Sequence, residues 1–159
     1  MSFYDWLLAL HVLAAGALVS ALVLYSVVIA AGWNLALPSE VSRMFRLSRA
    51  GDAAFAVGSI GTIVLGIWLA IDSDDFQVWD GWVIAALVLW AVAMETGRRT
   101  GDHYNRARDR ARALVAEGRD TPDPELGALV GSSRGLAFHA ATVLLVLALL
   151  VVMIYKPGA

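Results

Sequence analysis

The feature that most constrains this chain is the length of its uncharged segments. No Asp, Glu, Lys or Arg occurs in residues 6–39, and three more uncharged runs follow at 53–71, 81–94 and 135–155. A helix needs about 20 apolar residues to cross a hydrocarbon core of ~30 Å. The first and fourth runs exceed that length, the second reaches it narrowly and the third is short.

Composition agrees with a membrane protein. The chain is 59% hydrophobic and 16% charged, whereas soluble domains average roughly 45–50% apolar and about 25% charged residues. The apolar residues lie in blocks rather than alternating, which excludes a membrane β-barrel. Trp79 and Trp82 flank the start of the short third run, where interfacial aromatics are expected, so we interpret this run as a span as well.

The distribution of basic residues predicts the direction of the spans. Eleven of the twelve Lys and Arg residues lie in two connecting segments. The first segment carries Arg43, Arg46 and Arg49. The second carries Arg98, Arg99, Arg106, Arg108, Arg110, Arg112, Arg119 and Arg134. Four spans place both segments on one face, which the positive-inside rule makes cytoplasmic, whereas three spans would separate them.

We therefore predict a single all-α domain over residues 1–159. It is a four-transmembrane-helix bundle, antiparallel and up-down, with both termini outside the inner cell membrane. The expected spans are about 3–33, 50–71, 79–98 and 134–155. The cytoplasmic connections are about 34–49 and 99–133, and the external loop is about 72–78. Asp5 and the length of the first run argue against a cleaved signal peptide.

Local signals refine this layout. Residues 39–50 are expected to form a helical extension with Ser39 as its N-cap. The third helix is expected to continue past Met94, with a break at 117–124 and the last helix starting near Ser133. Pro157 forbids that helix from continuing. The short, acidic outer loop predicts that the second and third spans are antiparallel neighbours.

Small residues at four-residue spacing predict close helix packing. Such pairs occur in the first helix, at Gly16 and Ser20 and at Ala17 and Ala21. The other candidates are Gly58, Gly61 and Gly66 in the second helix and Ala137 and Ala141 in the fourth.

Ionisable residues inside a membrane are costly, so those within or beside the spans are functional candidates: His11, Asp52, Glu95 and His139. His11 lies about two turns into the first helix, ~12 Å from its outer end. It could be a neutral histidine hydrogen-bonded inside the bundle, or a ligand of a b-type haem or a metal. His139 lies in the opposite leaflet, so one haem held by both histidines is not expected.

Asp52, Glu95 and His139 are all expected at the cytoplasmic end, level with Arg49 and Arg98. Two interpretations stay open. The group could be a structural cluster that locks three helix ends together, or a proton relay or anion site.

Several functional classes lack support. The chain has no cysteine, which excludes disulfides and thiolate sites. It has no GxxxxGK[ST], HExxH or GxSxG motif. The arginine-rich stretch lacks interleaved aromatics, so no nucleic-acid partner is expected. Its arginines could contact anionic lipid headgroups.

Two segments carry a resemblance to a known family. The first-helix stretch Leu10-His11-Val12-Leu13, followed by small residues and Gly16, and the ending Tyr155-Lys156-Pro157 resemble a family of uncharacterised bacterial four-helix integral membrane proteins. That family looks like a branch of a group with the copper-resistance D-type proteins and a haem-containing protoporphyrinogen oxidase. The resemblance implies His11 as a haem or copper ligand. The usual Trp-x-Gly-Gly after the histidine is missing here, and no intramembrane lysine offers a second ligand.

Three functional hypotheses follow. The first is a multi-pass membrane protein that is non-enzymatic or an accessory subunit. The second is a haem-binding redox protein using His11. The third is a small proton-linked transporter using Asp52, Glu95 and His139. The lipid bilayer is the expected partner, and a homo-oligomer or a larger membrane complex is left open.

Overall fold

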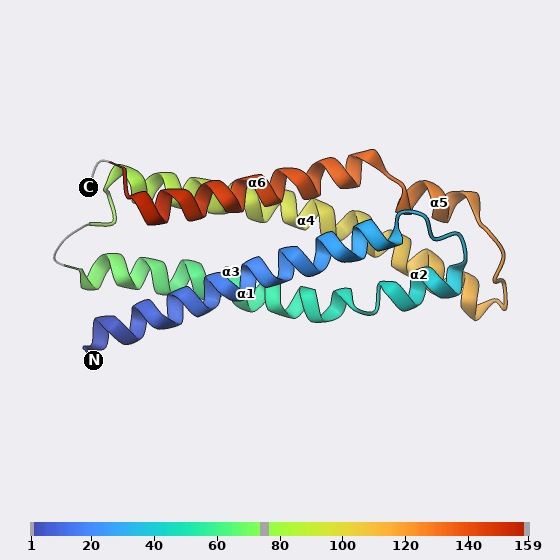
Figure 1. Cartoon of the computed structure of the whole chain (residues 1–159), viewed down its shortest axis with the longest axis horizontal. Coiled ribbons are helices and arrows are strands. Elements are labelled where there is room, and N and C mark those ends of the chain that lie inside the picture. Colours follow the sequence, from blue (N-terminus) through green and yellow to red (C-terminus); the bar gives the residue numbers. More distant parts are fainter. Residues whose placement is uncertain (1, 74–76, 158–159) are drawn as a thin grey trace.

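The computed structural model describes residues 2–73 and 77–157, which form six helices (Figure 1). In chain order these are α1 (Phe3–Gly32), α2 (Pro38–Met44), α3 (Ser48–Asp72), α4 (Gly81–Ala116), α5 (Pro124–Val130) and α6 (Ser133–Tyr155). No strand occurs in the described residues, and the all-α expectation is confirmed.

Four helical segments are long and apolar enough to cross a membrane: α1, α2 with α3, α4, and α5 with α6. Only 22–28% of each apolar window is buried inside the molecule. Most residues of each window are therefore at least partly exposed, which is costly for apolar side chains in water and favourable in lipid.

Side-chain caps and prolines explain where several helices begin and end. Ser2 and Asp5 form a capping box at the start of α1. The Ser132 hydroxyl accepts a hydrogen bond from the Gly135 amide at the start of α6. At the other end of α6, Lys156 adopts a left-handed conformation with φ 41°, and Pro157 follows. The predicted end of the last helix is confirmed.

The bundle consists of two helix pairs. α1 packs mainly against α3, and α4 packs mainly against α6, whereas α3 and α4 touch each other only slightly. Figure 1 shows α1 crossing α3 and α6 lying alongside α4. The segment between α3 and α4 therefore joins two pairs rather than two closely packed helices. The second and third spans, predicted to be antiparallel neighbours, make few contacts with each other.

Glycines on α3, rather than on α1, allow the closest helix approach. A Cβ atom on Gly58 would lie 2.9 Å from the Ala14 carbonyl oxygen, and one on Gly61 would lie 2.9 Å from the Ala14 Cβ. A Cβ on Gly16 would meet nothing within 4 Å, because Gly16 faces away from α3. The expected packing role is therefore confirmed for Gly58 and Gly61 and is wrong for Gly16.

α4 extends far beyond the thickness of a bilayer. Its 36 residues span about 54 Å at 1.5 Å per residue, against ~30 Å for a hydrocarbon core. The continuation of this helix past Met94 and the break after Ala116 are thus confirmed.

The C-terminal half of α4 packs with the C-terminal end of α1, with α2 and with α5. We call this part of the molecule, formed by these four segments, the extension. Its core is Val28, Ile29, Val41, Phe45, Tyr104, Ala107, Ala111, Leu114, Leu126 and Val130. Apart from Val28 and Ile29 of α1, this core lies in the segments predicted to be connections, and the short helix α5 within them was not predicted.

Polar contacts also hold the segments of the extension together. Arg110 forms ion pairs with Asp123 at 2.9 Å and with Glu125 at 3.1 Å. Ser39 donates hydrogen bonds from its amide and its hydroxyl to the Asp120 carboxylate. The expectation that Ser39 caps its helix is wrong, because α2 begins at Pro38 with Leu37 as the N-cap. Proline is favoured at the first helical position, where no N–H is needed.

Candidate functional site

An apolar cavity of about 360 Å³ lies between the two helix pairs. All four long helices contribute to its wall. It occupies the half of the bundle nearest the start of α1 and the end of α6, which we call the terminal end. The cavity exists because α1–α3 and α4–α6 pack tightly within each pair and only loosely between pairs. Its size lies in the range typical of small-molecule sites.

His11 is the one histidine in the cavity wall. The Thr62 backbone offers its imidazole a hydrogen bond, whereas Nδ1 is buried and makes no hydrogen bond of regular geometry to a described residue. A Cβ on Gly66 would lie 3.0 Å from the His11 Cε1, so the absence of a side chain there makes room for the ring. The histidine is thus held between α1 and α3 with one nitrogen unsatisfied.

The cavity ends at a polar rim. Lys156 and Tyr4 line it at the terminal end, and the Lys156 ammonium lies 5.6 Å from the centre of the Trp82 ring. That geometry is a cation–π contact. Lys156 is the only Lys or Arg outside the two arginine-rich segments.

His139 lies elsewhere, toward the extension. It is only 6% exposed, and its Nε2 lies 2.8 Å from the Ser26 hydroxyl. The Ser26 hydroxyl donates its single proton to the Leu22 carbonyl, so the His139 contact requires Nε2–H as the donor. A small cavity of about 40 Å³ adjoins the ring and is also lined by Thr100 and Thr142, which is enough space for a water molecule.

Asp52 joins three helices. It accepts a hydrogen bond from the Tyr25 hydroxyl of α1, and its other oxygen lies 3.7 Å from Arg108 of α4. The carboxylate therefore links α1, α3 and α4 on the side of the bundle nearest the extension. Sequence reasoning missed both partners. Arg108 was counted only as a topology signal, and Tyr25 is an uncharged residue inside the first apolar run.

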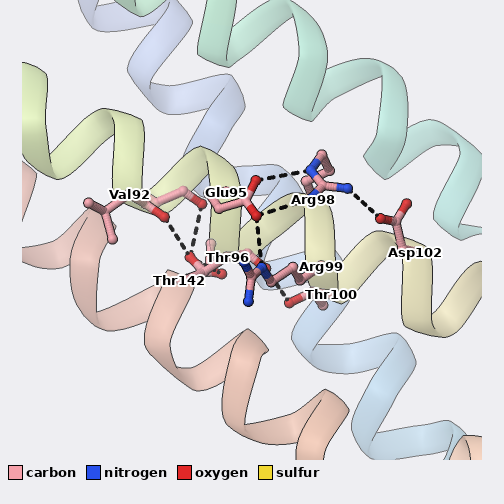
Figure 2. A network of polar contacts seen from close by, with 9 residues as sticks. Val92, Glu95, Thr96, Arg98, Arg99, Thr100, Asp102 and Thr142 are labelled. Atoms are coloured by element: carbon pink, nitrogen blue, oxygen red, sulfur yellow. Dashed lines mark hydrogen bonds and ion pairs between the residues drawn. The ribbon is translucent and has the colours of Figure 1, made fainter.

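Glu95 belongs to a network along the exposed side of α4 (Figure 2). Its carboxylate accepts hydrogen bonds from Arg98 and Arg99, and Arg98 also pairs with Asp102 at 2.8 Å. These contacts join residues three and four apart on one helix, where side chains are neighbours. Close by, the Thr142 hydroxyl donates to Thr96 at 2.9 Å and joins α6 to α4.

The three candidates at this end are therefore not one cluster. Asp52, Glu95 and His139 each have different partners, and no hydrogen bond or ion pair connects any two of them within the described part of the chain. Across residues 2–73 and 77–157, no group of three His, Asp or Glu side chains is arranged to hold a metal ion.

Comparison with known proteins places the chain at the level of a family. No curated protein and no solved structure is significantly similar to it. Residues 5–157 match the model of one family, described as predicted integral membrane protein (DUF2269). This match covers nearly the whole chain, so the protein belongs to the DUF2269 family of predicted integral membrane proteins.

Proposed function

We propose that this chain is a non-enzymatic membrane protein that binds an apolar or amphiphilic ligand in the cavity between its helix pairs. His11 supplies the polar contact. One observation carries the proposal: a buried, unpartnered imidazole nitrogen belongs to a residue in the wall of an apolar cavity of about 360 Å³. The arginine distribution supports an orientation with both termini outside the cell membrane.

The energetics favour a ligand with one hydrogen-bonding group. A buried polar atom without a partner costs about 1–3 kcal/mol. Binding sites are typically apolar concavities in which a few polar groups fix the orientation of the ligand. The His11 Nδ1 and the apolar wall around it match that description. A ligand that satisfies this nitrogen would remove the cost and bury apolar surface at once.

The arrangement gives less support to a proton-linked transporter. A relay needs groups that can exchange protons with one another. Glu95 is exposed and paired with arginines of its own helix, while His139 is buried against Ser26. We therefore interpret Asp52, Glu95 and His139 as structural links between and along helices.

The proposal is tested by identifying what the protein retains during purification. The wild type, His11→Leu and the control His139→Leu would be extracted in mild detergent, and bound compounds analysed by mass spectrometry. We expect a compound that His11→Leu loses and His139→Leu keeps. Retention of the same compound by both variants, or the absence of any compound from the wild type, would overturn the proposal.

A haem-binding redox protein is the second candidate, and the same nitrogen favours it. His11 and the thioether residue Met153 both line the cavity and would hold the iron, since His–Met ligation is known for haem. Bound haem would supply one-electron chemistry. The chain itself would supply the histidine and thioether ligands, an apolar surrounding that excludes water and, at Lys156, a positive charge near the rim. This candidate also agrees with the resemblance to the haem-containing group.

A visible spectrum separates the two candidates. Protein expressed with haem available would show a Soret band that is absent in His11→Leu if haem is the ligand. A colourless wild type would remove this second candidate and leave the first intact.

A further inference from the structure

We propose that the occupant of the cavity is one hydrocarbon chain of a membrane phospholipid, with its anionic headgroup at Lys156. This inference rests on the proposed binding function and names the class of ligand. It is carried by three observations: the shape of the cavity, its incomplete enclosure by helices whose outer side chains are apolar, and the position of Lys156 at one end.

The cavity is long and narrow. On α1 its wall runs from Tyr4 to Val19, a distance of about 22 Å at 1.5 Å per residue. That is longer than half of a ~30 Å hydrocarbon core. A volume of 360 Å³ spread over this length is closer to the shape of a single extended chain than to that of a broad, flat ring system.

The cavity is partly open rather than fully enclosed. Wall residues of both helix pairs are also exposed on the surface of the molecule, among them Val12 of α1 at 59% and Ile154 of α6 at 73%. In a bilayer these side chains face lipid. A chain of the surrounding lipid can therefore enter sideways between the pairs, without crossing a headgroup layer.

Water is a poor occupant of such a space. An apolar cavity stays dry unless polar groups offer a water molecule two to four partners. Away from the rim, the wall carries the polar groups of His11, Thr62 and Trp90. The Thr62 hydroxyl already donates to the Gly58 carbonyl, and the Trp90 indole N–H donates to the Ser59 carbonyl. The membrane itself supplies an apolar occupant at high concentration. The ester group of a phospholipid could reach the depth of the His11 imidazole and accept a hydrogen bond from it.

Charge at the rim argues for an anionic headgroup. Lys156 lines the cavity at the terminal end and is the only Lys or Arg of the chain in that region. Asp5, Asp72 and Asp80 lie at the same end of the bundle and repel an anion, so the attraction for a headgroup comes from Lys156 alone. The Lys156 ammonium lies over the Trp82 ring, and tryptophan is enriched at the membrane interface, where phosphate groups lie.

The test uses the full chain in vesicles of equal parts phosphatidylglycerol and phosphatidylcholine, followed by mild detergent extraction and native mass spectrometry. We expect the wild type to retain one phospholipid, enriched about fivefold in phosphatidylglycerol. Lys156→Gln should keep a lipid and lose the enrichment. Ala86→Phe should lose the lipid, because Ala86 is buried in the cavity wall. Its matched control is Ala85→Phe, at an exposed position of the same helix.

The outcomes separate this inference from the proposed function. Equal lipid retention by Ala86→Phe and Ala85→Phe would overturn the lipid assignment, as would a wild type without bound lipid. A different compound, lost from both Ala86→Phe and His11→Leu, would overturn the lipid assignment and support the binding function. A phospholipid lost from Ala86→Phe and fully retained by His11→Leu would support the lipid and overturn the role of His11. Ala15→Phe, on the opposite pair, repeats the filling test if Ala86→Phe does not fold.

Discussion

A Cβ atom on Gly58 of α3 would lie 2.5 Å from the backbone nitrogen of Leu18 of α1. Real Cβ contacts do not come this close, so the two helices meet at this point through backbone and hydrogen alone. In lipid, where apolar burial drives helix association weakly, such close packing is the main source of stability between helices. The α1–α3 pair, and the wall of the cavity that it forms, depend on this glycine.

Replacing Gly58 by Ala should therefore force α1 and α3 apart and destabilise the bundle by about 1–3 kcal/mol. Gly16→Ala is the matched control, since a Cβ at Gly16 would meet nothing within 4 Å, and alanine favours the helix over glycine. Thermal unfolding in detergent measures both. A Gly58→Ala protein as stable as Gly16→Ala would contradict the close approach.

The membrane helices and their order could be predicted from the sequence, but the contacts between residues of different helices could not. Uncharged runs predicted the membrane helices, and Pro157 predicted the end of α6, because length, hydropathy and proline chemistry act locally. Which glycine meets which helix depends on the rotation of each helix about its axis. No such information is present in the spacing of Gly16 and Ser20, and Gly16 faces outward.

The candidate site was predicted in part for the same reason. Depth along a helix was readable, so His11 was singled out as an intramembrane histidine. Depth alone could not show that His139 faces Ser26 while Asp52 faces Tyr25. The cavity arises from the looseness between the two helix pairs, a property of the whole bundle that no single segment carries.

The hydrogen bond between His139 and Ser26 predicts that mutations of these two residues have coupled effects on stability. Ser26→Ala leaves a buried Nε2–H without an acceptor, at a cost of about 1–3 kcal/mol. In the double variant Ser26→Ala/His139→Ala, the second change should cost less than it does alone. A double-mutant cycle on thermal stability should give a coupling of about 0.5–3 kcal/mol. Strictly additive effects would show that the hydrogen bond contributes nothing, and changed ligand retention would argue for a functional role.

Acid should loosen the start of α5. The Asp123 carboxylate accepts a hydrogen bond from the Leu126 amide and pairs with Arg110; these contacts, the amide first, lower the pKa of Asp123 below its ordinary value of 3.8. A lowered folded-state pKa gives stability that is fully present above about pH 4 and is lost as the pH falls through the folded-state pKa.

Pepsin cleavage within residues 117–131, compared at each pH between the wild type and Asp123→Asn, would measure this effect. The asparagine side chain of this variant can still cap the helix but does not titrate. We expect protection in the wild type to fall more steeply than in Asp123→Asn below about pH 4. Parallel pH profiles for the two proteins would contradict the assignment.

The orientation of the bundle is the prediction with the widest consequences, because it decides in which leaflet the cavity lies. The arginine partition predicts that the extension faces the cell interior and the loop between α3 and α4 faces outward.

The chain has no cysteine, so single-cysteine variants can be labelled without background. Leu47→Cys and Ala113→Cys probe the extension, and Gln77→Cys probes the outer loop; all three positions are exposed. A membrane-impermeant maleimide applied to intact spheroplasts should label only Gln77→Cys, and permeabilisation should add the other two. Labelling of Leu47→Cys and Ala113→Cys from opposite sides would be incompatible with four spans, while labelling of both from outside would invert the bundle and place Lys156 and the mouth of the cavity in the inner leaflet.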